Sequence, residues 1–452
     1  MSFHKQSIEL RLDDVTHTDL LNLVEHFQSI HGTCFLYSAR NETNDRSFIF
    51  AYPFDEIHVE NCVVSRTYKN TIWQHATKNP WSFLKEFASQ GVEEKDLLSG
   101  FFSYEMAFYG DLFDLYTSKN IDGPSDAYMQ KCSLEIIYEH DTKKLFATKK
   151  NTLPGGLFES IDTEWIRKRC TQTDLKVEKS TPCLLCSTED EQSFCKKVEA
   201  VQELIRDGVV YQVNISHEMS LQKNFLPFQI FRKLCKKNPS SFFSFFHVNG
   251  TYIVSSSPER FICKKGDLLE TRPIKGTRSK TDCPVKNSQI KKELRSSVKE
   301  VSELMMICDL MRNDLSMISV PGTTRVRELI RQEEYSHIYH QLSIIQSKPK
   351  PLHPIDMIQK IFPGGSVTGC PKRESLKTIH ALENRRRGIY TGSIGYIDKN
   401  GDFDFNIAIR TIVITKNALS FGVGSGIVID SDPYQEYLET LHKAQAIKES
   451  LE

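Results

Sequence analysis

Three apolar stretches near the carboxyl end of the chain follow one another with only short connections between them. They are GIYTGSIGYI (388–397), DFDFNIAIRTIVI (402–414) and ALSFGVGSGIVI (418–429). Their length and their content of isoleucine, valine and phenylalanine predict β-strands. Strands joined by such short connections pair antiparallel, because a parallel pair needs a crossover of a dozen or more residues. The carboxyl third therefore predicts an antiparallel sheet, followed by a helix over 434–452.

The rest of the chain repeats this mixture of helices and strands. Consecutive antiparallel strands flanked by helices predict an α+β fold rather than a doubly wound parallel sheet. The middle of the chain is the least apolar part, so we expect an amino-terminal region over 1–150, a connecting segment over 151–190 and a second region from 191. Apolar spacing predicts helices over 20–30, 80–90, 191–208 and 292–315, and strands over 32–39, 46–60, 209–221, 241–248 and 251–258.

Charge and composition exclude several classes of protein. Lysine plus arginine and aspartate plus glutamate both total 58, so no general field attracts nucleic acid. No window reaches the ~18 uncharged apolar residues of a membrane span, and the amino terminus lacks the apolar stretch of a secretory signal. We expect a cytoplasmic protein with no membrane or nucleic-acid partner. Its twelve cysteines are then reduced, and the CxxC of Cys183 and Cys186 is interpreted as inert.

Lys275 lies beside a glycine in the segment ETRPIKGTRSK (270–280). A lysine in such a place is ordinarily a solvated surface charge. A nucleophilic lysine must be neutral, and with an unperturbed pKa of ~10.4 it is roughly one part in a thousand neutral near pH 7. Desolvation or a neighbouring cation lowers such a pKa, and Arg272 and Arg278 are close in the sequence. The segment alone leaves both interpretations open.

Two predicted helices carry glutamates three residues apart: Glu300 and Glu303 in one, Glu436 and Glu439 in the other. Residues at this spacing share one helix face, so each helix presents a pair of carboxylates. Either pair alone is ordinarily a solvated acidic face. Two pairs that faced each other would form an all-oxygen site suited to Mg²⁺, which keeps several of its waters and binds few carboxylates.

Two glycine-rich stretches, FPGGSVTGCPK (362–372) and GVGSGIV (422–428), lack the residues of nucleotide-binding loops. Cys370 and Pro371 stand where a phosphate-binding loop needs lysine and then serine or threonine. Ile427 stands where a dinucleotide-binding fingerprint needs its third glycine. Both stretches still offer backbone N–H groups to an anion, for which a carboxylate is the best candidate.

Arg410 interrupts the apolar stretch 402–414. A guanidinium in such a strand must reach water at a sheet edge or pair with an anion, because burying it unpaired costs several kcal/mol. If it faces a pocket lined by the glycine-rich stretches, its planar fork suits a bidentate contact with a substrate carboxylate.

Eight blocks of sequence between 191 and 449 occur together and in a fixed order. They are YQVNIS, SPERF, RPIKGT, KEVSELMMICDLMRND, PGGSVTGCPK, RGIYTGSIGY, FNIAIRT and GSGIVIDSDPYQEYLETLHKA. Together they resemble the chorismate-utilising enzyme family. The resemblance implies a chorismate-binding catalytic region over 191–449, with two intertwined subdomains around packed antiparallel sheets, helices outside and the site in the cleft between them. Upstream, FLYSA, RSFIFAYP and GFFSYE resemble the amino-terminal part of anthranilate and aminodeoxychorismate synthases.

Two positions distinguish the branches of this family. Isochorismate and salicylate synthases resemble one another in carrying a water-activating lysine where this chain has Gln212. Anthranilate synthases usually have PIAGT where this chain has PIKGT (273–277), and a lysine there is the mark of the aminodeoxychorismate synthases. The resemblance therefore implies that Lys275 attacks C2 of chorismate as the 4-hydroxyl leaves, before ammonia adds at C4.

The resemblance also implies roles for residues around Lys275. Glu259 is similar to the general acid that protonates the departing hydroxyl, which requires a carboxyl kept partly protonated by its surroundings. His340 is similar to a histidine near the ring, with a structural histidine as the alternative. Gln212 is a further substrate contact, and the residues similar to the carboxylate-binding set are Tyr390, Arg410, Lys443 and the backbone around Thr368, Gly369, Gly424 and Gly426.

Mg²⁺ is the cofactor that the resemblance implies. Glu303 and Glu439 resemble its direct ligands, and Glu300 and Glu436 resemble residues that hold metal-bound waters. The ion would contact a carboxylate of chorismate and neutralise its charge.

The reaction implied is the amination of chorismate at C4 to 4-amino-4-deoxychorismate, for 4-aminobenzoate and folate synthesis. We recognise no glutaminase or lyase region, so we expect ammonia from a separate glutaminase subunit in a heterodimer, and a separate aminodeoxychorismate lyase that acts on the product. The alternatives are anthranilate synthase component I and, from another class, a non-catalytic chorismate-binding or glutaminase-regulating subunit.

Two places depart from the family pattern. Ser316 and Met317 replace the Gly-Arg that often follows there, which removes a cation from that region. Ser38 in FLYSA corresponds to the tryptophan-binding serine of the family, but its neighbours differ, so no feedback inhibition is inferred.

Overall fold

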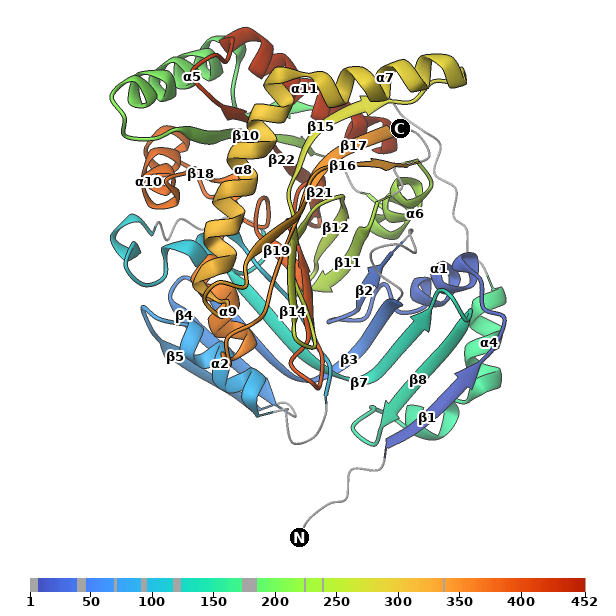
Figure 1. Ribbon diagram of the computed structural model, residues 1–452. Coiled ribbons are helices and arrows are strands. Elements are labelled where there is room, and N and C mark those ends of the chain that lie inside the picture. Colours follow the sequence, from blue (N-terminus) through green and yellow to red (C-terminus); the bar gives the residue numbers. More distant parts are fainter. Residues whose placement is uncertain are drawn as a thin grey trace.

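The structure is a computed structural model, and it describes residues 7–38, 46–68, 71–90, 96–116, 123–172, 185–222, 225–237, 240–335 and 338–451. Helices lie outside a strongly curled sheet (Figure 1). The helices are α1 (His17–Glu25), α2 (Trp81–Ser89), α3 (Leu157–Ser160), α4 (Thr163–Thr171), α5 (Glu191–Arg206), α6 (Pro227–Lys237), α7 (Pro284–Ser296), α8 (Val298–Met317), α9 (Pro354–Ile361), α10 (Lys372–Glu383) and α11 (Pro433–Leu451), with 3₁₀ turns η1 (Tyr104–Phe108), η2 (Phe113–Leu115) and η3 (Gly365–Val367).

The strands alternate with these helices along both halves of the chain. They are β1 (Ser7–Leu12), β2 (Cys34–Tyr37), β3 (Arg46–Glu60), β4 (Val63–Tyr68), β5 (Thr71–Ala76), β6 (Leu98–Phe102), β7 (Ala127–Glu139), β8 (Lys144–Lys150), β9 (Cys186–Ser187), β10 (Gln212–Gln222), β11 (Phe242–Val248), β12 (Thr251–Ser257), β13 (Arg260–Lys265), β14 (Leu268–Arg272), β15 (Ile274–Ser279), β16 (Arg325–Glu334), β17 (Ile338–Ser347), β18 (Gly369–Cys370), β19 (Ser393–Ile397), β20 (Phe403–Asn406), β21 (Thr411–Ile414) and β22 (Ala418–Ile427).

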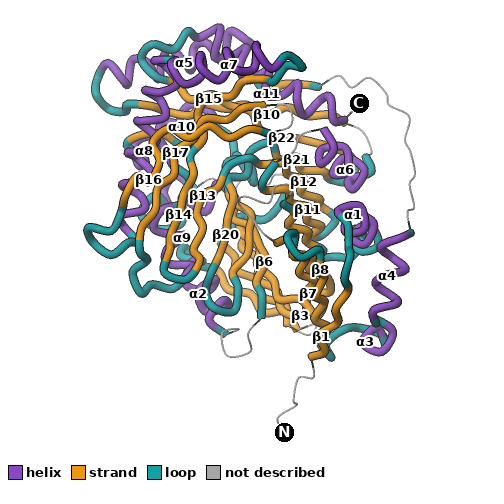
Figure 2. Tube along the Cα trace, turned by 45° about the vertical axis from the view of Figure 1, so that its right-hand side comes forward, coloured by secondary structure: helices purple, strands orange, loops and turns teal. Residues whose placement is uncertain are grey.

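One hydrogen-bonded path connects these strands, and every strand pairing among the described residues is antiparallel. The path runs β10, β22, β21, β12, β11, β2, β3, β7, β6, β19, β20, β13, β14, β17, with β15 and β16 both paired to β17. It passes from the second half of the chain to the first at β2 and returns at β6. Figure 2 shows the curled course of the strands. The predicted α+β fold with intertwined parts is confirmed. The residue boundaries of the predicted regions stay a prediction.

The predicted single helix over 292–315 is wrong, because two helices meet at Ser297. Ser297 has extended backbone angles (φ −65°, ψ 108°), and its hydroxyl accepts the backbone N–H of Glu300 at 3.5 Å. Serine suits this capping position better than a helix interior, since its hydroxyl satisfies a free N–H at the helix start. The break places Glu300 in the first turn of α8 and Glu303 in the second.

The predicted strand over 402–414 is also wrong as one element. β20 ends at Asn406, β21 begins at Thr411, and Arg410 between them has a φ of +50°. A positive φ is uncommon for a residue other than glycine and interrupts a strand. β20 pairs with β13 and β19, whereas β21 pairs with β12 and β22. The break therefore moves the chain from one arm of the sheet to the other.

No helix among the described residues is long and apolar enough to cross a membrane. Cys186 has a free, exposed thiol, whereas Cys183 lies outside the described residues, so the interpretation of the CxxC stays a prediction.

The join between the two halves at β2 gives a test of stability. Phe35 of β2 is 0% exposed and packs against the rings of Tyr37 and Phe231 at centroid distances of 5.3 and 5.7 Å. We expect Phe35→Ala to lower the free energy of unfolding by about 3 to 5 kcal/mol, because it leaves a cavity in the core. Denaturant unfolding measures this. The control Ile72→Ala, at a side chain 66% exposed, should change stability by less than about 0.5 kcal/mol.

Candidate functional site

The two ends of the sheet meet at Gly426 of β22. A Cβ atom added to Gly426 would lie 2.7 Å from Nε2 of Gln212 on β10 and 3.3 Å from Nζ of Lys275 on β15. Two side-chain nitrogen atoms from opposite ends of the sheet thus converge over one bare glycine. Lys275 is half-buried, and its amine points toward β22 instead of away from the molecule.

A β-bulge aims Lys275 at this point. The register of β15 against β17 shifts between Ile274 and Thr277, so Lys275 and Gly276 together oppose a single residue of β17. Gly276 has a φ of +84°, which glycine adopts without strain. Bulges bend a strand and redirect a side chain, and they are frequent next to active sites.

Glu259 lies between β12 and β13 and is 5% exposed. Burial raises the pKa of its carboxyl to about 7, although a hydrogen bond from Oγ of Ser366 (2.7 Å) and the charge of Lys275 both act to lower that pKa. A carboxyl with a pKa near neutrality is populated in both forms at pH 7. This is the property required of a general acid.

His340 is buried on β17, directly opposite Thr277 of β15. Its Nδ1 lies 2.8 Å from the Thr277 hydroxyl, and the ring of Tyr335 stands edge-on at a centroid distance of 5.2 Å. These contacts fix the imidazole beside Thr277, which lies two residues after Lys275 in β15. Its role, catalytic or structural, stays a prediction.

Tyr390 lies against the bare face of β22. A Cβ atom on Gly422 would overlap its ring, and one on Gly424 would lie 2.9 Å from its hydroxyl. Burial raises the pKa of Tyr390 to about 12, so the hydroxyl remains a proton donor at neutral pH. Lys443 of α11 donates to the carbonyl of Gly424 (2.9 Å) and pairs with Glu439 (2.7 Å). A hydroxyl and an ammonium thus flank the glycines of this strand.

Thr368 and Gly369 lie on the other side of β10. The carbonyl of Thr368 accepts the backbone N–H of Asn214 (2.9 Å), and its hydroxyl donates to the carbonyl of Gly364 (2.8 Å). Gly369 has a φ of +135°, and a Cβ atom there would overlap the carbonyl oxygen of Gln212. The side chain of Thr368 is therefore engaged within its own loop.

Arg410 sits at the break between β20 and β21 and not at a sheet edge. Its guanidinium is half-buried, and burial lowers its pKa. Among the described residues no carboxylate forms an ion pair with it. A half-buried cation without a counter-ion is costly, so this position suits an anionic ligand.

The first glutamate pair lies at the start of α8, which packs against β15 and β17. Oε1 of Glu300 accepts a hydrogen bond from Nη1 of Arg278 (2.5 Å). Its Oε2 is buried without a hydrogen-bond partner and would lie 2.8 Å from a Cβ atom on Gly276. Glu303 follows one turn later and is half-buried.

The second pair lies at the start of α11, which packs against β22. Glu436 is 3% exposed and accepts hydrogen bonds from the hydroxyls of Ser425 and Ser431. Burial acts to raise the pKa of Glu439, but the charges of Lys443 and Lys275 outweigh this effect, so the pKa lies below its ordinary value. Lys275 is thus in the field of both α11 and Glu259.

The four glutamates offer the type of ligand atom that Mg²⁺ prefers. All are carboxylate oxygens, and one of them is buried without a partner, as suits an ion that binds few carboxylates and keeps its waters. The four glutamates do not form a tight cluster, since within the described residues the only three potential ligand atoms within 4.8 Å of one another belong to His31, Glu56 and His58.

That second cluster is a hydrogen-bonded group in the amino-terminal half. Nδ1 of His31 accepts the backbone N–H of Asn249 (3.2 Å), so its Nε2 carries the proton that it donates to Glu56 (2.7 Å). A metal-bound histidine instead donates from its second nitrogen. The hydroxyl of Tyr128 also donates to Glu56 (2.9 Å). The cluster is satisfied without an ion.

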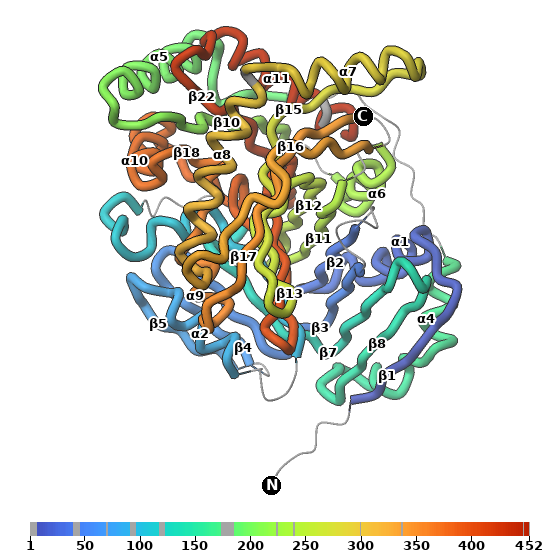
Figure 3. The backbone as a smooth tube through the Cα atoms, viewed as in Figure 1, coloured from blue at the N-terminus to red at the C-terminus, as the bar shows by residue number. Residues whose placement is uncertain are grey.

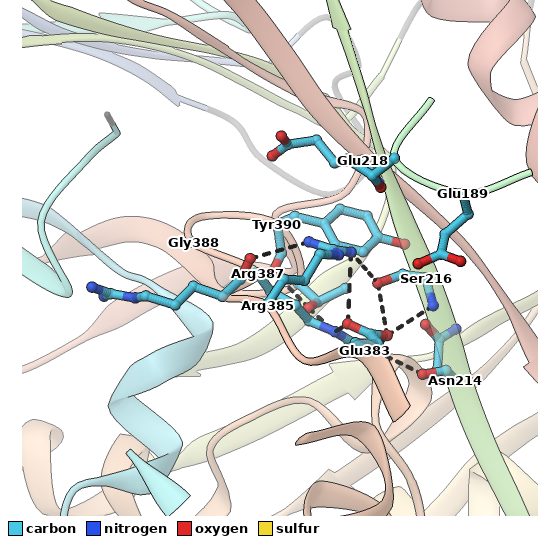
Figure 4. Close-up of polar contacts among 12 residues, drawn as sticks. Glu189, Asn214, Ser216, Glu218, Glu383, Arg385, Arg387, Gly388 and Tyr390 are labelled. Atoms are coloured by element: carbon cyan, nitrogen blue, oxygen red, sulfur yellow. Dashed lines mark hydrogen bonds and ion pairs between the residues drawn. The ribbon is translucent and has the colours of Figure 1, made fainter. Parts of the chain in front are cut away.

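A buried charge network supports β10 beside Tyr390, and the sequence analysis missed it (Figure 4). Nη2 of Arg387 donates to Glu383 (2.6 Å) and to the carbonyl of Asn214 (2.7 Å). The hydroxyl of Ser216 donates to the same carboxylate (2.9 Å). Burial acts to raise the pKa of Glu383, yet the arginines lower it, so the carboxylate stays charged. The only signal in the sequence is the run of three arginines at 385–387.

The two departures from the family pattern lie away from these contacts. Met317 is 42% exposed at the carboxyl end of α8, next to Ser316. Ser38 lines a pocket with Ser241 and Tyr396, between β2, β11 and β19.

Residues 32–449 match the family described as chorismate binding enzyme. The chain is 35% identical over 360 residues to aminodeoxychorismate synthase component 1 of Bacillus subtilis, covering 78% of this chain and 76% of that protein. It is 31% identical over 386 residues to anthranilate synthase component 1 of Lactococcus lactis, covering 82% and 84%.

Solved structures show the same fold. The menaquinone-specific isochorismate synthase of Escherichia coli superposes with a TM-score of 0.78 at 16% identity, covering 99% of this chain and 95% of that one. Anthranilate synthase component I of Streptococcus pneumoniae gives 0.73 at 24% identity, covering 91% and 94%. The resemblance seen in the sequence is confirmed, and the chain belongs to the chorismate-binding enzyme family.

Proposed function

We propose that the chain aminates chorismate at C4, with ammonia from a partner glutaminase subunit, to give 4-amino-4-deoxychorismate. The observation that carries the proposal is the position of Lys275. Its Nζ approaches Gly426 beside the amide of Gln212, in the field of the buried Glu259. An amine held among such groups is suited to attack a ring bound in the same cleft.

The proposed reaction has two displacement steps. The neutral amine of Lys275 forms a bond to C2 while the bond between C4 and its oxygen breaks, and Glu259 gives its proton to that oxygen, which leaves as water. Ammonia then forms a bond to C4 while the bond between C2 and Lys275 breaks, so that the lysine leaves as a neutral amine, and the new C4 ammonium returns one proton to Glu259. The sum is chorismate plus ammonia giving 4-amino-4-deoxychorismate plus water.

The remaining residues hold the substrate in this proposal. Arg410 and Lys443 would pair with its carboxylates, and the hydroxyl of Tyr390 would donate a hydrogen bond. Glu303 and Glu439 would bind Mg²⁺ directly, with Glu300 and Glu436 contacting its waters. Mg²⁺, when bound, would neutralise one carboxylate of chorismate.

The names of the relatives support a partner glutaminase subunit and indicate the alternative function. Aminodeoxychorismate synthase component 1 and anthranilate synthase component 1 are both named as one component of a larger enzyme, which supports a separate glutaminase subunit. A lyase acting on the product would then complete 4-aminobenzoate synthesis. Anthranilate synthase component I is the second candidate, favoured by the 31% identity to the Lactococcus lactis protein. Lys275 favours amination at C4.

The first test replaces the proposed nucleophile. With chorismate, Mg²⁺ and ammonium salt, wild-type protein should form aminodeoxychorismate, detected as 4-aminobenzoate after added lyase. Lys275→Ala should lower this rate roughly 100-fold or more, because the reacting group is lost. Without ammonia, intact-mass measurement of the wild-type protein should show an adduct of chorismate less one water on Lys275.

The matched control is Lys280→Ala. Lys280 lies in the same segment but pairs with Glu334 (2.7 Å) on the surface, so its loss should leave the rate within about twofold of wild type. Anthranilate as the product would establish the rival function. Unchanged turnover by Lys275→Ala would rule out the covalent step, and no product of either kind would favour a non-catalytic subunit.

The pKa of Glu259 predicts the pH dependence. A general acid acts in its protonated form, and that fraction of Glu259 decreases as pH rises through about 7, so at a constant concentration of free ammonia the slope of turnover against pH should decrease there. Ser366→Ala removes a hydrogen bond that stabilises the charged carboxylate, which should raise the pKa and move this change of slope to higher pH by roughly one unit. Rate profiles between pH 5 and 9 measure this. Glu259→Gln should lose both the activity and the change of slope, and a shift of Ser366→Ala to lower pH would contradict the assignment.

A further inference from the structure

Gln341 is a polar residue in a fully buried place. Its side chain on β17 is 0% exposed, and among the described residues neither its Oε1 nor its Nε2 has a hydrogen-bond partner. Buried amide groups are almost always hydrogen-bonded, and one without partners destabilises a fold. A residue that breaks a local rule of folding in this way is expected mainly at functional sites.

The register of β16 and β17 shows which way Gln341 faces. Gln341 opposes Gln332 of β16, whose amide donates to the carbonyl of Lys291 in α7 (2.8 Å). Two residues further along β17, on the same face, Ser343 acts to lower the pKa of the Cys308 thiol of α8, so it lies close to that helix. Since alternate residues of a strand share a face, Gln341 faces the layer formed by α7 and α8. Figure 3 shows these helices beside β15, β16 and β17.

The pairing with β15 places Gln341 next to the start of α8. The residues that oppose it there are those of the bulge, Lys275 and Gly276. The bare face of Gly276 is turned to the same helix layer, since a Cβ atom on it would lie 2.8 Å from Oε2 of Glu300 and 3.0 Å from Leu294 of α7. Opposed residues on one face of an antiparallel pair have Cβ atoms ~5 Å apart. The amide of Gln341 therefore reaches the surroundings of Glu300.

Glu300 and Gln341 have complementary unpaired groups, one an acceptor and the other a donor. Oε1 of Glu300 is held by Arg278, but its Oε2 is a buried acceptor without a donor. Nε2 of Gln341 is a buried donor without an acceptor. Both atoms lie in the layer between α8 and the strands β15 and β17.

We propose that Gln341 is a positioning residue for Glu300. Its amide N–H donates to Oε2 of Glu300 through one water, and so fixes the orientation of that carboxylate toward Mg²⁺. The inference rests on the proposed function, in which Glu300 holds an Mg²⁺-bound water. Gln341 itself contacts neither the ion nor the substrate, and it acts on the affinity for Mg²⁺.

The test is Gln341→Leu in the full chain, with MgCl₂ titrated calorimetrically in the presence of chorismate. Leucine keeps the bulk of the side chain and removes both polar atoms. We expect the Mg²⁺ dissociation constant to rise roughly tenfold or more, the range found when a hydrogen-bond partner of a metal ligand is lost. Without Mg²⁺, the melting temperature should stay the same or rise, because the unpaired amide is gone. If Gln341 were only structural, the variant would keep the Mg²⁺ dissociation constant of wild type and would have a lower melting temperature.

Gln332→Leu is the matched control, since Gln332 lies on the same face of the next strand and contacts α7 but not Glu300. Its Mg²⁺ affinity should equal that of wild type. Gln341→Met replaces the leucine variant if that protein does not fold. Equal Mg²⁺ affinity in wild type and the Gln341 variant overturns this inference alone, as does an equal loss in both glutamine variants. A wild-type chain that binds no Mg²⁺ overturns the proposed metal site together with the inference.

Discussion

The closure of one sheet on itself is the constraint on which the site depends. β10 and β15 are far apart along the hydrogen-bonded path, yet Gln212 and Lys275 converge over Gly426. This approach is possible because β22 presents glycines where other residues would project side chains, at Gly422, Gly424 and Gly426. A shift of register by one residue would turn these bare positions to the opposite face of the sheet. The long series of antiparallel pairings therefore determines whether the amine of Lys275 reaches the rest of the site.

Two buried glutamates show how the same fold sets opposite charge states within this region. Glu383 and Glu259 are both almost fully buried. Arg387 and Arg385 surround Glu383, so its pKa lies below the ordinary value and the carboxylate anchors β10 as a fixed charge. Glu259 receives one serine hydrogen bond and the field of lysines, which do not offset its desolvation, and its pKa rises to about 7. The number and distance of the cations, and not burial alone, separate a structural carboxylate from one able to exchange a proton near neutral pH.

Local pattern in the sequence predicted the α+β class and strands such as β3, β10 and β12, because alternation and apolar content are properties of short segments. It did not predict β4 to β8 or β13 to β17, and it joined two elements into one where the chain changes direction. Ser297 ends one helix and caps the next, and Arg410 breaks a strand at positive φ, although both lie within segments of continuous pattern. The site roles came from the resemblance of the motifs to a family, while the convergence on Lys275 depends on distant pairings that no local pattern encodes. The partnership of Glu383 with Arg387 was missed for the same reason, since charges at helical spacing look like a solvated face.

The unsatisfied polar groups near the site connect its function to its stability. Oε1 of Gln212 and Oδ1 of Asn214 are buried without partners among the described residues, and Arg410 is half-buried without a counter-ion. Each such group, while unpaired, destabilises the fold, by about 1 to 3 kcal/mol for a neutral atom. A ligand with carboxylates and hydroxyls supplies the missing partners only when β10, β22 and β15 are held together around it. Binding and folding are therefore thermodynamically linked, because a ligand that binds only the folded arrangement of the sheet ends also stabilises it.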